Sequence, residues 1–233
     1  MALARWKDLC IDAADALVAG RFWAAVLGLE GEVLADDHMV LRGRRREQTI
    51  WINSVPEPKS VKNRLHLDVG VLSLDPLLDL GATVLRPEGD DGIRWTLMAD
   101  PDGGEFCAFL RPEIDTDAPA ELHELVLDCG SSEASQREAA WWAEVLGAAT
   151  DDDGRGFWWV EDIAGAPFDC LSFIPVPEPK RVKNRLHWDL ICDEVPALVE
   201  RGCTVLRTPD DEIDWHVLTD PAGNEFCAFP SVR

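Results

Sequence analysis

The chain contains one fifteen-residue sequence twice, and this repeat constrains its fold more than any other feature. VPEPKSVKNRLHLDV, residues 55–69, returns 121 positions later as VPEPKRVKNRLHWDL, residues 176–190. Shorter matches occur in the same order in both halves, namely FWAAVLG (22–28) with WWAEVLG (141–147), LGATVLR (80–86) with RGCTVLR (201–207), and DPDGGEFCAF (100–109) with DPAGNEFCAF (220–229). Ordered self-similarity over most of a chain indicates a tandem duplication.

The duplication divides the 233 residues into two halves of ordinary domain size. The segment RPEIDTDAPAE, residues 111–121, lies between them and is polar and contains two prolines, as linkers often do. We therefore predict a first domain over residues 1–112, a linker over 113–120 and a second domain over 121–233.

Both halves begin with the same predicted elements. Alternating apolar residues predict an opening strand, KDLCID (7–12) in the first half and HELVLD (123–128) in the second. An amphipathic helix follows each strand, with polar residues where it begins and glycine where it ends. The predicted N-caps are Asp15 and either Ser131 or Ser132, and the glycines are Gly28 and Gly147.

The remainder of each half also repeats. Two or three strands lead to a loop containing PEPK, and then come another strand, a short helix and two final strands joined by a turn. The turn sequences DPDGG and DPAGN have the aspartate, proline and glycine that tight turns require. This order predicts an α+β fold built of βαβββ units, two units in each half.

Composition limits the possible functions. A formal net charge of −22 argues against binding to nucleic acid or to an anionic membrane, because both need clustered lysine and arginine. The acidity fits either a soluble protein of an acidic proteome or a site for a cationic ligand. No basic, apolar leader begins the chain, and the seven cysteines form no C-x-x-C pair, which predicts buried thiols and a cytoplasmic location.

The segments FWAAVLG, KNRLHLDV and DPDGGEFCAF resemble the vicinal oxygen chelate superfamily, which includes glyoxalases, bleomycin-resistance proteins and extradiol dioxygenases. The resemblance covers roughly residues 5–110 and 121–230. It implies two tandem glyoxalase-like domains, in which paired βαβββ units form a curved mixed sheet enclosing a cavity. It does not define a reaction, because the superfamily contains lyases, isomerases, dioxygenases, thiol transferases and metal-free binding proteins.

In this superfamily the metal ligands come from the first strand of a domain, from the strand that opens its second unit and from its last strand. In the second half, the resemblance implies that His123, His187 and Glu225 are the ligands. Strand alternation places His123 on the side of Leu125, and Glu225 on the side of Cys227. Two imidazoles and a carboxylate with open positions suit a divalent iron, manganese, zinc or nickel ion.

The first half departs from this pattern. His66 and Glu105 are present, but Lys7 occupies the position of the first-strand ligand, and a protonated amine cannot bind a metal. We therefore expect no metal in the first domain, and a Lys7–Glu105 ion pair if the three residues converge. The alternative for both halves is structural: His66 and His187 are then satisfied core histidines, while Glu105 and Glu225 pair with nearby lysine or arginine.

Further residues near the predicted site have weaker assignments. Glu225 and His216 are the candidate catalytic groups, with His216 as a proton donor. The candidate pocket residues, beyond His66, Glu105 and Lys7, are Trp188, Asp189, Arg185, Trp159 and Cys227. Core packing is the alternative for Cys227 and the tryptophans, and anchoring of the PEPK loop is the alternative for Arg185.

Two functions from different classes follow. The first is a metal-dependent enzyme, a lyase, isomerase or dioxygenase, acting on a small molecule with two neighbouring oxygens; the lack of tyrosine disfavours the dioxygenase. The second is a metal-free protein that sequesters a cationic aromatic compound, as in bleomycin-type antibiotic resistance. The expected partner is a small molecule in either case. The chain is expected to be a monomer with domain pairing inside one chain, or a homodimer.

Overall fold

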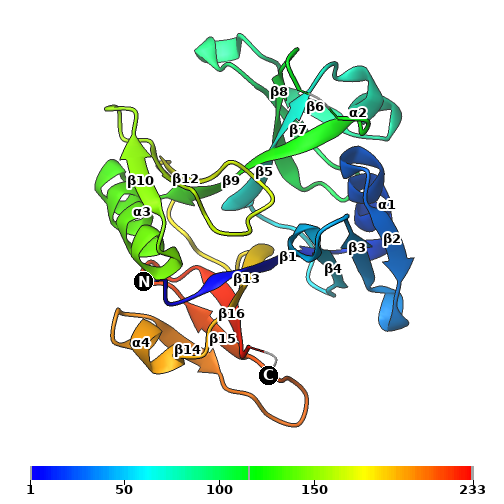
Figure 1. Ribbon diagram of the computed structural model, residues 1–233. Coiled ribbons are helices and arrows are strands. Elements are labelled where there is room, and N and C mark those ends of the chain that lie inside the picture. Colours follow the sequence, from blue (N-terminus) through cyan, green and yellow to red (C-terminus); the bar gives the residue numbers. More distant parts are fainter. Residues whose placement is uncertain (1, 115, 232–233) are drawn as a thin grey trace.

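The computed structural model describes residues 2–114 and 116–231, which form two eight-stranded mixed sheets with four helices (Figure 1). Unit 1 contains β1 (Arg5–Ala13), α1 (Ala16–Leu27), β2 (Glu30–Val33), β3 (Met39–Arg42) and β4 (Ile50–Ser54). Unit 2 contains β5 (Leu65–Val71), α2 (Asp75–Asp79), β6 (Thr83–Arg86), β7 (Thr96–Ala99) and β8 (Glu105–Leu110).

The second half repeats this order. Unit 3 contains β9 (Ala120–Cys129), α3 (Ser132–Leu146), β10 (Ala149–Asp152), β11 (Trp158–Glu161) and β12 (Cys170–Pro175). Unit 4 contains β13 (Leu186–Ile191), α4 (Val195–Val199), β14 (Thr204–Arg207), β15 (His216–Thr219) and β16 (Glu225–Phe229). The predicted α+β class and its four βαβββ units are confirmed.

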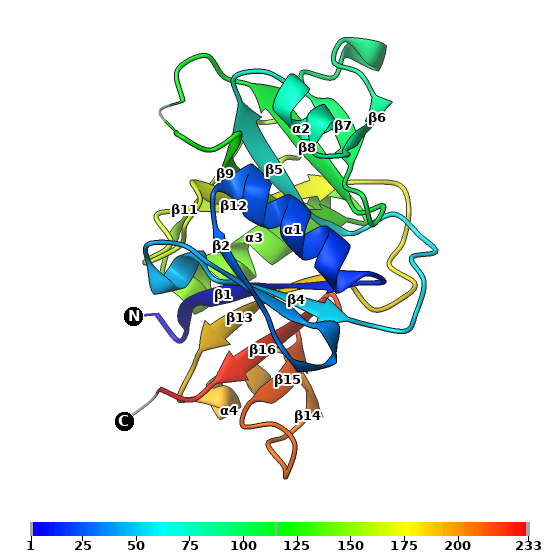
Figure 2. The same cartoon turned by 90° about the vertical axis from the view of Figure 1, so that its right-hand side faces the viewer.

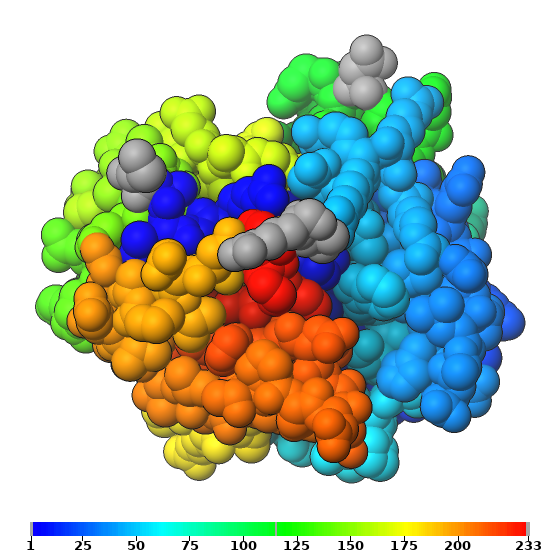
Figure 3. Space-filling model, turned by 60° about the horizontal axis from the view of Figure 1, so that its bottom comes forward, coloured from blue at the N-terminus to red at the C-terminus, as the bar shows by residue number. Residues whose placement is uncertain are grey.

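Each sheet combines one unit from each half. Sheet A has the strand order β14-β15-β16-β13-β1-β4-β3-β2, so it joins units 1 and 4 through the antiparallel pair β1 and β13. Sheet B has the order β10-β11-β12-β9-β5-β8-β7-β6 and joins units 2 and 3 through β5 and β9. The space-filling view shows the blue first unit against the orange and red last unit (Figure 3). The halves thus pair through their sheets within one chain.

The two long helices begin and end as the sequence predicts. The Asp15 carboxylate accepts a hydrogen bond from the Val18 amide, and the Ser131 hydroxyl accepts one from the Ala134 amide. Such side chains satisfy amide groups that the first turn of a helix leaves unpaired. Gly28 and Gly147 end the helices with φ values of 64° and 63°, a left-handed conformation that glycine adopts without strain.

Each long helix contacts both sheets, and this defines the core. In α1, Trp23 packs edge-on against Phe106 of sheet B, with ring centroids 5.2 Å apart. In α3, the fully buried Trp142 packs edge-on against Trp188 of sheet A at 4.8 Å and against Phe226 at 5.2 Å. Figure 2 shows α1 between the strands of the two sheets. The apolar face of each sheet therefore points to the helices, and its other face carries the polar side chains.

The two PEPK loops, defined as loop 1 (residues 55–64) and loop 2 (176–185), bind each other's half. Arg64 of loop 1 donates to the carbonyl of Glu178, and at 2.5 Å to that of Asp128. Arg185 of loop 2 donates to the carbonyl of Glu57 at 2.8 Å and to that of Asp12 at 3.0 Å. The arginines of the repeated phrase therefore connect the halves. None of the helices among the described residues has the length and hydropathy to span a membrane.

Candidate functional site

The strands at the centre of sheet A bring together a cluster of metal-binding side chains, called face A. Along β1, Leu9, Ile11 and Ala13 enter the core, so alternation sends Asp8, Cys10 and Asp12 to the other face. The strand register places Cys10 opposite His187 and Asp8 opposite Asp189, and β16 places Cys227 beside Asp189. Side chains from three strands thus meet at one point.

The distances within face A are short enough for a shared ligand. The Cys227 sulfur lies 3.6 Å from His187 Nε2, and the Cys10 sulfur lies 3.6 Å from Asp189 Oδ2. His187 Nε2 is also 3.6 Å from Asp189 Oδ1. One ligand atom each of Cys10, His187 and Asp189 lies within 4.8 Å of the others. Sulfur, imidazole and carboxylate together form a donor set that zinc, iron or nickel accepts.

Face A contains buried polar atoms that lack a partner. His187 Nδ1, Asp189 Oδ1 and Asp8 Oδ1 have no hydrogen-bond partner among the described residues. A buried polar atom left unpaired costs about 1–3 kcal/mol, so most such atoms in native proteins have one. The two carboxyl oxygens lie on neighbouring acids, Asp8 and Asp189, and a cation or a shared proton would pair them. His187 directs Nε2 towards Cys227 and Asp189, so the donor set fits a metal ion bound through Nε2.

Burial dominates the electrostatics of face A. Burial lowers the pKa of His187 to about 4, so the imidazole is neutral at neutral pH, as metal binding requires. Burial and the nearby carboxylate of Asp8 raise the pKa of Asp189. Burial also raises the pKa of the thiols of Cys10 and Cys227. Without a cation the thiols therefore keep their protons, which a bound metal would displace.

Lys7 lies beside face A, where a β-bulge falls between Trp6 and Asp8. Its ammonium group is 2.6 Å from Asp8 Oδ2, 3.7 Å from Asp189 Oδ2 and 3.9 Å from the centre of the Phe229 ring. The expected pair of Lys7 with Glu105 does not form, because β1 and β8 belong to different sheets. Lys7 instead partly compensates the carboxylates of face A.

Sheet B carries the equivalent cluster, face B, formed by His66, Asp68 and Cys107. Here the histidine lies between two carboxylates: His66 Nδ1 is hydrogen-bonded to Asp68 Oδ1 at 2.8 Å, and Nε2 is 3.8 Å from Asp128 Oδ1. Burial lowers the pKa of His66, but the carboxylates of Asp68 and Asp128 outweigh it and raise the pKa well above its ordinary value. Val126 stands opposite His66, where face A has Cys10 opposite His187. Face B is therefore a closed ion pair.

The structure does not bring the three predicted metal ligands together. His187 and Glu225 lie in sheet A, but His123 lies on β9 of sheet B, because the units pair across the halves. Arg111 contacts His123 Nδ1 at 3.0 Å and Nε2 at 2.7 Å, and Asp169 lies 2.9 Å from Nδ1. A register shift between Asp68 and Val69 accompanies this position. The predicted triad is therefore not a single site.

Glu105 and Glu225 both hold a PEPK loop. Glu105 accepts from Lys59 at 2.7 Å and from the Asn63 amide at 3.1 Å. Glu225 accepts from Lys180 at 3.0 Å and from the Asn184 amide at 3.1 Å. The two carboxylates are thus already satisfied by the same pair of donors. The structural alternative considered for these glutamates agrees with this arrangement.

The remaining predicted residues divide between face A and the framework. Asp189 and Cys227 are part of face A, whereas Trp188 packs in the core and Arg185 anchors a loop. Trp159 donates to Glu161, and the half-buried His216 makes no side-chain hydrogen bond or ion pair within the described part of the chain. Sequence reasoning missed Asp8 and Cys10. The alternation in KDLCID carried the signal, since it puts both on one face.

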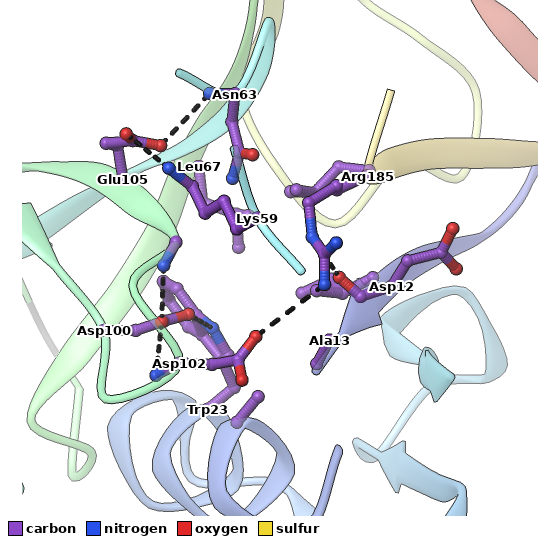
Figure 4. Close-up of a pocket in the computed structure, with 14 residues that line it drawn as sticks. Asp12, Ala13, Trp23, Lys59, Asn63, Leu67, Asp100, Asp102, Glu105 and Arg185 are labelled. Carbon is purple, nitrogen blue, oxygen red and sulfur yellow. Dashed lines mark hydrogen bonds and ion pairs between the residues drawn. The ribbon is translucent and has the colours of Figure 1, made fainter. Parts of the chain in front are cut away.

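A small cavity lies where units 1, 2 and 4 meet (Figure 4). Its volume of about 20 Å³ is enough for one water molecule. Beside it, the Asp102 carboxylate accepts from the amides of Ala14 and Asp15 at 2.9 and 2.8 Å and lies 4.0 Å from Arg185. Asp100 accepts from the Trp23 indole at 3.0 Å. These contacts join three units, so the cavity belongs to a structural junction.

Comparisons with known proteins agree with this architecture. Residues 8–109 and 124–229 each match the family model described as a glyoxalase-like domain. Glyoxalase I from Zea mays has a similar structure, with a TM-score of 0.68, 16% identity, and coverage of 97% of this chain and 92% of that one. A putative dioxygenase from Bacillus subtilis has a TM-score of 0.66 at 13% identity, covering 100% and 86%. No curated protein sequence matches significantly.

Proposed function

Because the chain belongs to the family of glyoxalase-like domains, we propose that face A binds one divalent transition metal and acts on a small molecule with two neighbouring oxygens. The observation that carries the proposal is the convergence of Cys10, His187 and Asp189, one ligand atom of each lying within 4.8 Å of the others, with a histidine whose pKa is lowered and which is therefore neutral. The equivalent histidine of face B has both nitrogens near carboxylates. Only one of the two related clusters thus has a neutral histidine.

Cys10, His187, Asp189 and Cys227 would hold the ion. Two sulfurs, one imidazole and one carboxylate favour zinc, iron or nickel over manganese, because soft thiolates select the softer ions. A bound ion of this kind acts as a Lewis acid that stabilises negative charge on a substrate oxygen. Trp51 donates its indole N–H to Asp8 Oδ2 at 3.1 Å and so fixes the carboxylate beside the cluster.

Lys7 and Asp8 are the groups of this chain that support acid–base chemistry. The Lys7 ammonium and the Asp8 carboxylate, 2.6 Å apart, form a donor and an acceptor next to face A. Lys7 would stabilise negative charge that develops on the carbonyl oxygen of the substrate. Asp8 would accept a proton from the substrate carbon next to that carbonyl. His216 of β15 was the predicted proton donor; it remains a candidate, and its side chain makes no hydrogen bond or ion pair among the described residues.

The test has a readout that does not depend on knowing the substrate. Protein purified without chelator or nickel affinity resin is expected to contain about one equivalent of metal per chain. Replacement of that metal by cobalt(II) is expected to give a thiolate-to-cobalt charge-transfer band. The band should weaken strongly in Cys227→Ser and persist in Cys107→Ser, the equivalent thiol of face B. Lack of any metal after reconstitution with iron, zinc and nickel would contradict the proposal.

A proton-exchange experiment tests the reaction class. Small carbonyl compounds with a neighbouring hydroxyl are incubated with the metal-loaded protein in heavy water and followed by proton NMR. Stabilisation of an enolate predicts exchange of the proton on the carbon next to the carbonyl, and its loss in Asp8→Asn. Persistence of the metal in Asp8→Asn would separate loss of the base from loss of the ion.

The second candidate function is metal-free binding of a cationic aromatic compound. The net charge of −22 favours it, and so does the niche of Phe229, Asp8 and Asp189, which accepts a cation. In this structure, however, the ammonium group of Lys7 occupies that niche. A cationic ligand would have to displace Lys7, so Lys7→Met is expected to tighten binding of a cationic dye if this function is the correct one.

A further inference from the structure

A large cavity lies between loop 1 and loop 2, beyond the end of face A. Its volume of about 760 Å³ falls within the range of small-molecule sites. The two loops line it with equivalent residues, and Asp12 and Asp128, the polar residues near the ends of β1 and β9, complete the wall. His187, Cys227 and Cys10 do not line it. The candidate metal ligands are therefore not part of the cavity wall, although Asp12 and Lys183 of the wall lie close enough to influence the charge of His187.

The wall of this cavity differs in charge from the rest of the protein. Six basic and four acidic side chains line it, an excess of two positive charges, whereas the whole chain has a net charge of −22. Three of the bases are neutralised: Lys59 pairs with Glu105, Lys62 with Asp128 and Lys183 with Asp12. Arg185 lies 4.0 Å from the Asp102 carboxylate, whereas Arg64 donates to backbone carbonyls, which do not cancel its charge.

Arg181 is the base available to a ligand. It is exposed and makes no hydrogen bond or ion pair through its side chain within residues 2–114 and 116–231. The exposed acids at the cavity, Glu57 and Glu178, make no ion pair within those residues either. A guanidinium group with all its donors free suits the two oxygens of a carboxylate, sulfonate or phosphate.

The wall of the cavity also contains exposed apolar side chains. Val61 and Val182 occupy equivalent positions in the two loops and remain 44% and 47% exposed. Val55, Pro58 and Pro179 add further apolar surface to the same wall. Exposed apolar groups gathered at a cavity indicate that a ligand covers them. A ligand matching this wall has an apolar body and one anionic group.

The loops are also held in place before any ligand binds. Arg64 reaches loop 2 at Glu178 and Arg185 reaches loop 1 at Glu57, so each loop is fixed by the other half. A site fixed in advance loses less conformational entropy on binding. Lys62 and Lys183 add to that connection, because Lys62 pairs with Asp128 and Lys183 with Asp12 of the other half. The exposed Val61 and Val182 do not contribute to it, yet both copies of the repeat contain a valine at this position. Their retention is explained by a role at the cavity.

We propose that the cavity between the two PEPK loops binds a small organic anion with an apolar body, and that Arg181 holds its anionic group. Position 60 of loop 1 corresponds to position 181 of loop 2 and carries serine. The site therefore has one strong anion-binding position, and the chain itself supplies two matched substitutions. Arg181→Ser gives loop 2 the residue of loop 1, and Ser60→Arg gives loop 1 the residue of loop 2.

The probe for the test is 8-anilinonaphthalene-1-sulfonate, which combines an aromatic body with one sulfonate. Fluorescence titration of the folded full chain is expected to show saturable binding of about one equivalent that weakens with added salt. Arg181→Ser should weaken binding at least fivefold, and Ser60→Arg should strengthen it. Val61→Asp should also weaken it, because a carboxylate would replace apolar surface and repel the sulfonate.

Two controls make the result specific. Arg155→Ser removes an arginine whose side chain has no partner among the described residues and which does not line the cavity, so it should leave binding unchanged. His187→Ala should also leave it unchanged, which separates this inference from the metal proposal. Thermal unfolding shows that each variant folds. Equal binding by the wild type, Arg181→Ser and Ser60→Arg would overturn the proposal, as would preference for the cationic dye ethidium.

Discussion

Face A and face B arise from the same duplicated residues, but they have reached different electrostatic states. On face B, His66 lies between Asp68 and Asp128, and the carboxylates raise its pKa. On face A, burial lowers the pKa of His187 to about 4. The difference shows that a histidine present in both copies of a repeat does not by itself define a function. The residues that surround it in the folded structure define its charge.

The partner that changes most is the residue on the neighbouring strand. Cys10 faces His187, whereas Val126 faces His66. Asp12, the equivalent of Asp128, is bound by Lys183 and by Asn53 at 3.3 Å. Face A therefore gains a second thiol and retains a neutral imidazole. Face B lacks that thiol, and its charged histidine cannot donate a lone pair to a metal.

The largest expected effect comes from breaking the ion pair of face B. Asp68→Asn leaves His66 buried without its nearest carboxylate, which should destabilise the protein by about 3–5 kcal/mol. The equivalent change Asp189→Asn removes a carboxylate close to Asp8, so in metal-free protein it should be neutral or stabilising. Urea unfolding in the presence of a chelator measures both. Equal losses would show that the two faces are not electrostatically different.

The second prediction exchanges Cys10 and Val126, the residues opposite the two histidines. Cys10→Val gives face A the residue of face B and should weaken metal binding by more than about 100-fold, because even supporting residues contribute 10–100-fold. Val126→Cys gives face B the second thiol. It should not create a site, since His66 stays protonated between its carboxylates. Competition with a chromogenic chelator measures the affinities, and a second metal equivalent in Val126→Cys would contradict the explanation.

Glu105 and Glu225 should behave alike although the faces differ. Each accepts hydrogen bonds from one lysine and one asparagine amide. Glu105→Gln and Glu225→Gln are therefore expected to destabilise the chain by about 2 kcal/mol each, as measured by urea unfolding. Neither should change the metal content. Loss of metal in Glu225→Gln alone would return this residue to the ligand set.

The smallest effect is a change in the pH dependence of stability. The pKa of His66 is higher in the folded state than in the unfolded state, so its contribution is complete below about pH 6.5. The contribution is lost as the pH rises through the folded pKa. In chelator, the free energy of unfolding of wild type should fall as the pH rises above about 6.5, and more steeply than that of His66→Gln. Parallel curves would show that His66 is not stabilised as a cation.

Much of the fold was predictable from local signals. The caps at Asp15 and Ser131 and the glycines at 28 and 147 have the chemistry that helix ends need, and the repeat revealed equivalent units. The pairing of units was not predictable. The strand sequences do not specify whether a unit pairs with the other unit of its own half or with a unit of the other half. Contacts such as Trp23 with Phe106 and Trp142 with Trp188, which join a helix to the other sheet, are long-range and carry no local sequence signal.

The candidate site was only partly predictable for the same reason. His187, Asp189 and Cys227 were candidates from unit 4 alone, and they do converge. Their remaining partners come from β1, about 180 residues earlier, so a search within the second half chose His123 instead. The side-chain alternation in KDLCID was correct, but it could not show which strand would lie beside β1.

Elemental analysis of His187→Ala and His66→Ala, purified in parallel without chelator or affinity nickel, tests the central difference most directly. Both variants remove one buried histidine from equivalent strands, and thermal unfolding shows whether each is folded. We expect about one metal equivalent in wild type and in His66→Ala, and almost none in His187→Ala. Equal metal content in the two variants, or a loss confined to His66→Ala, would contradict the assignment of the metal site to face A.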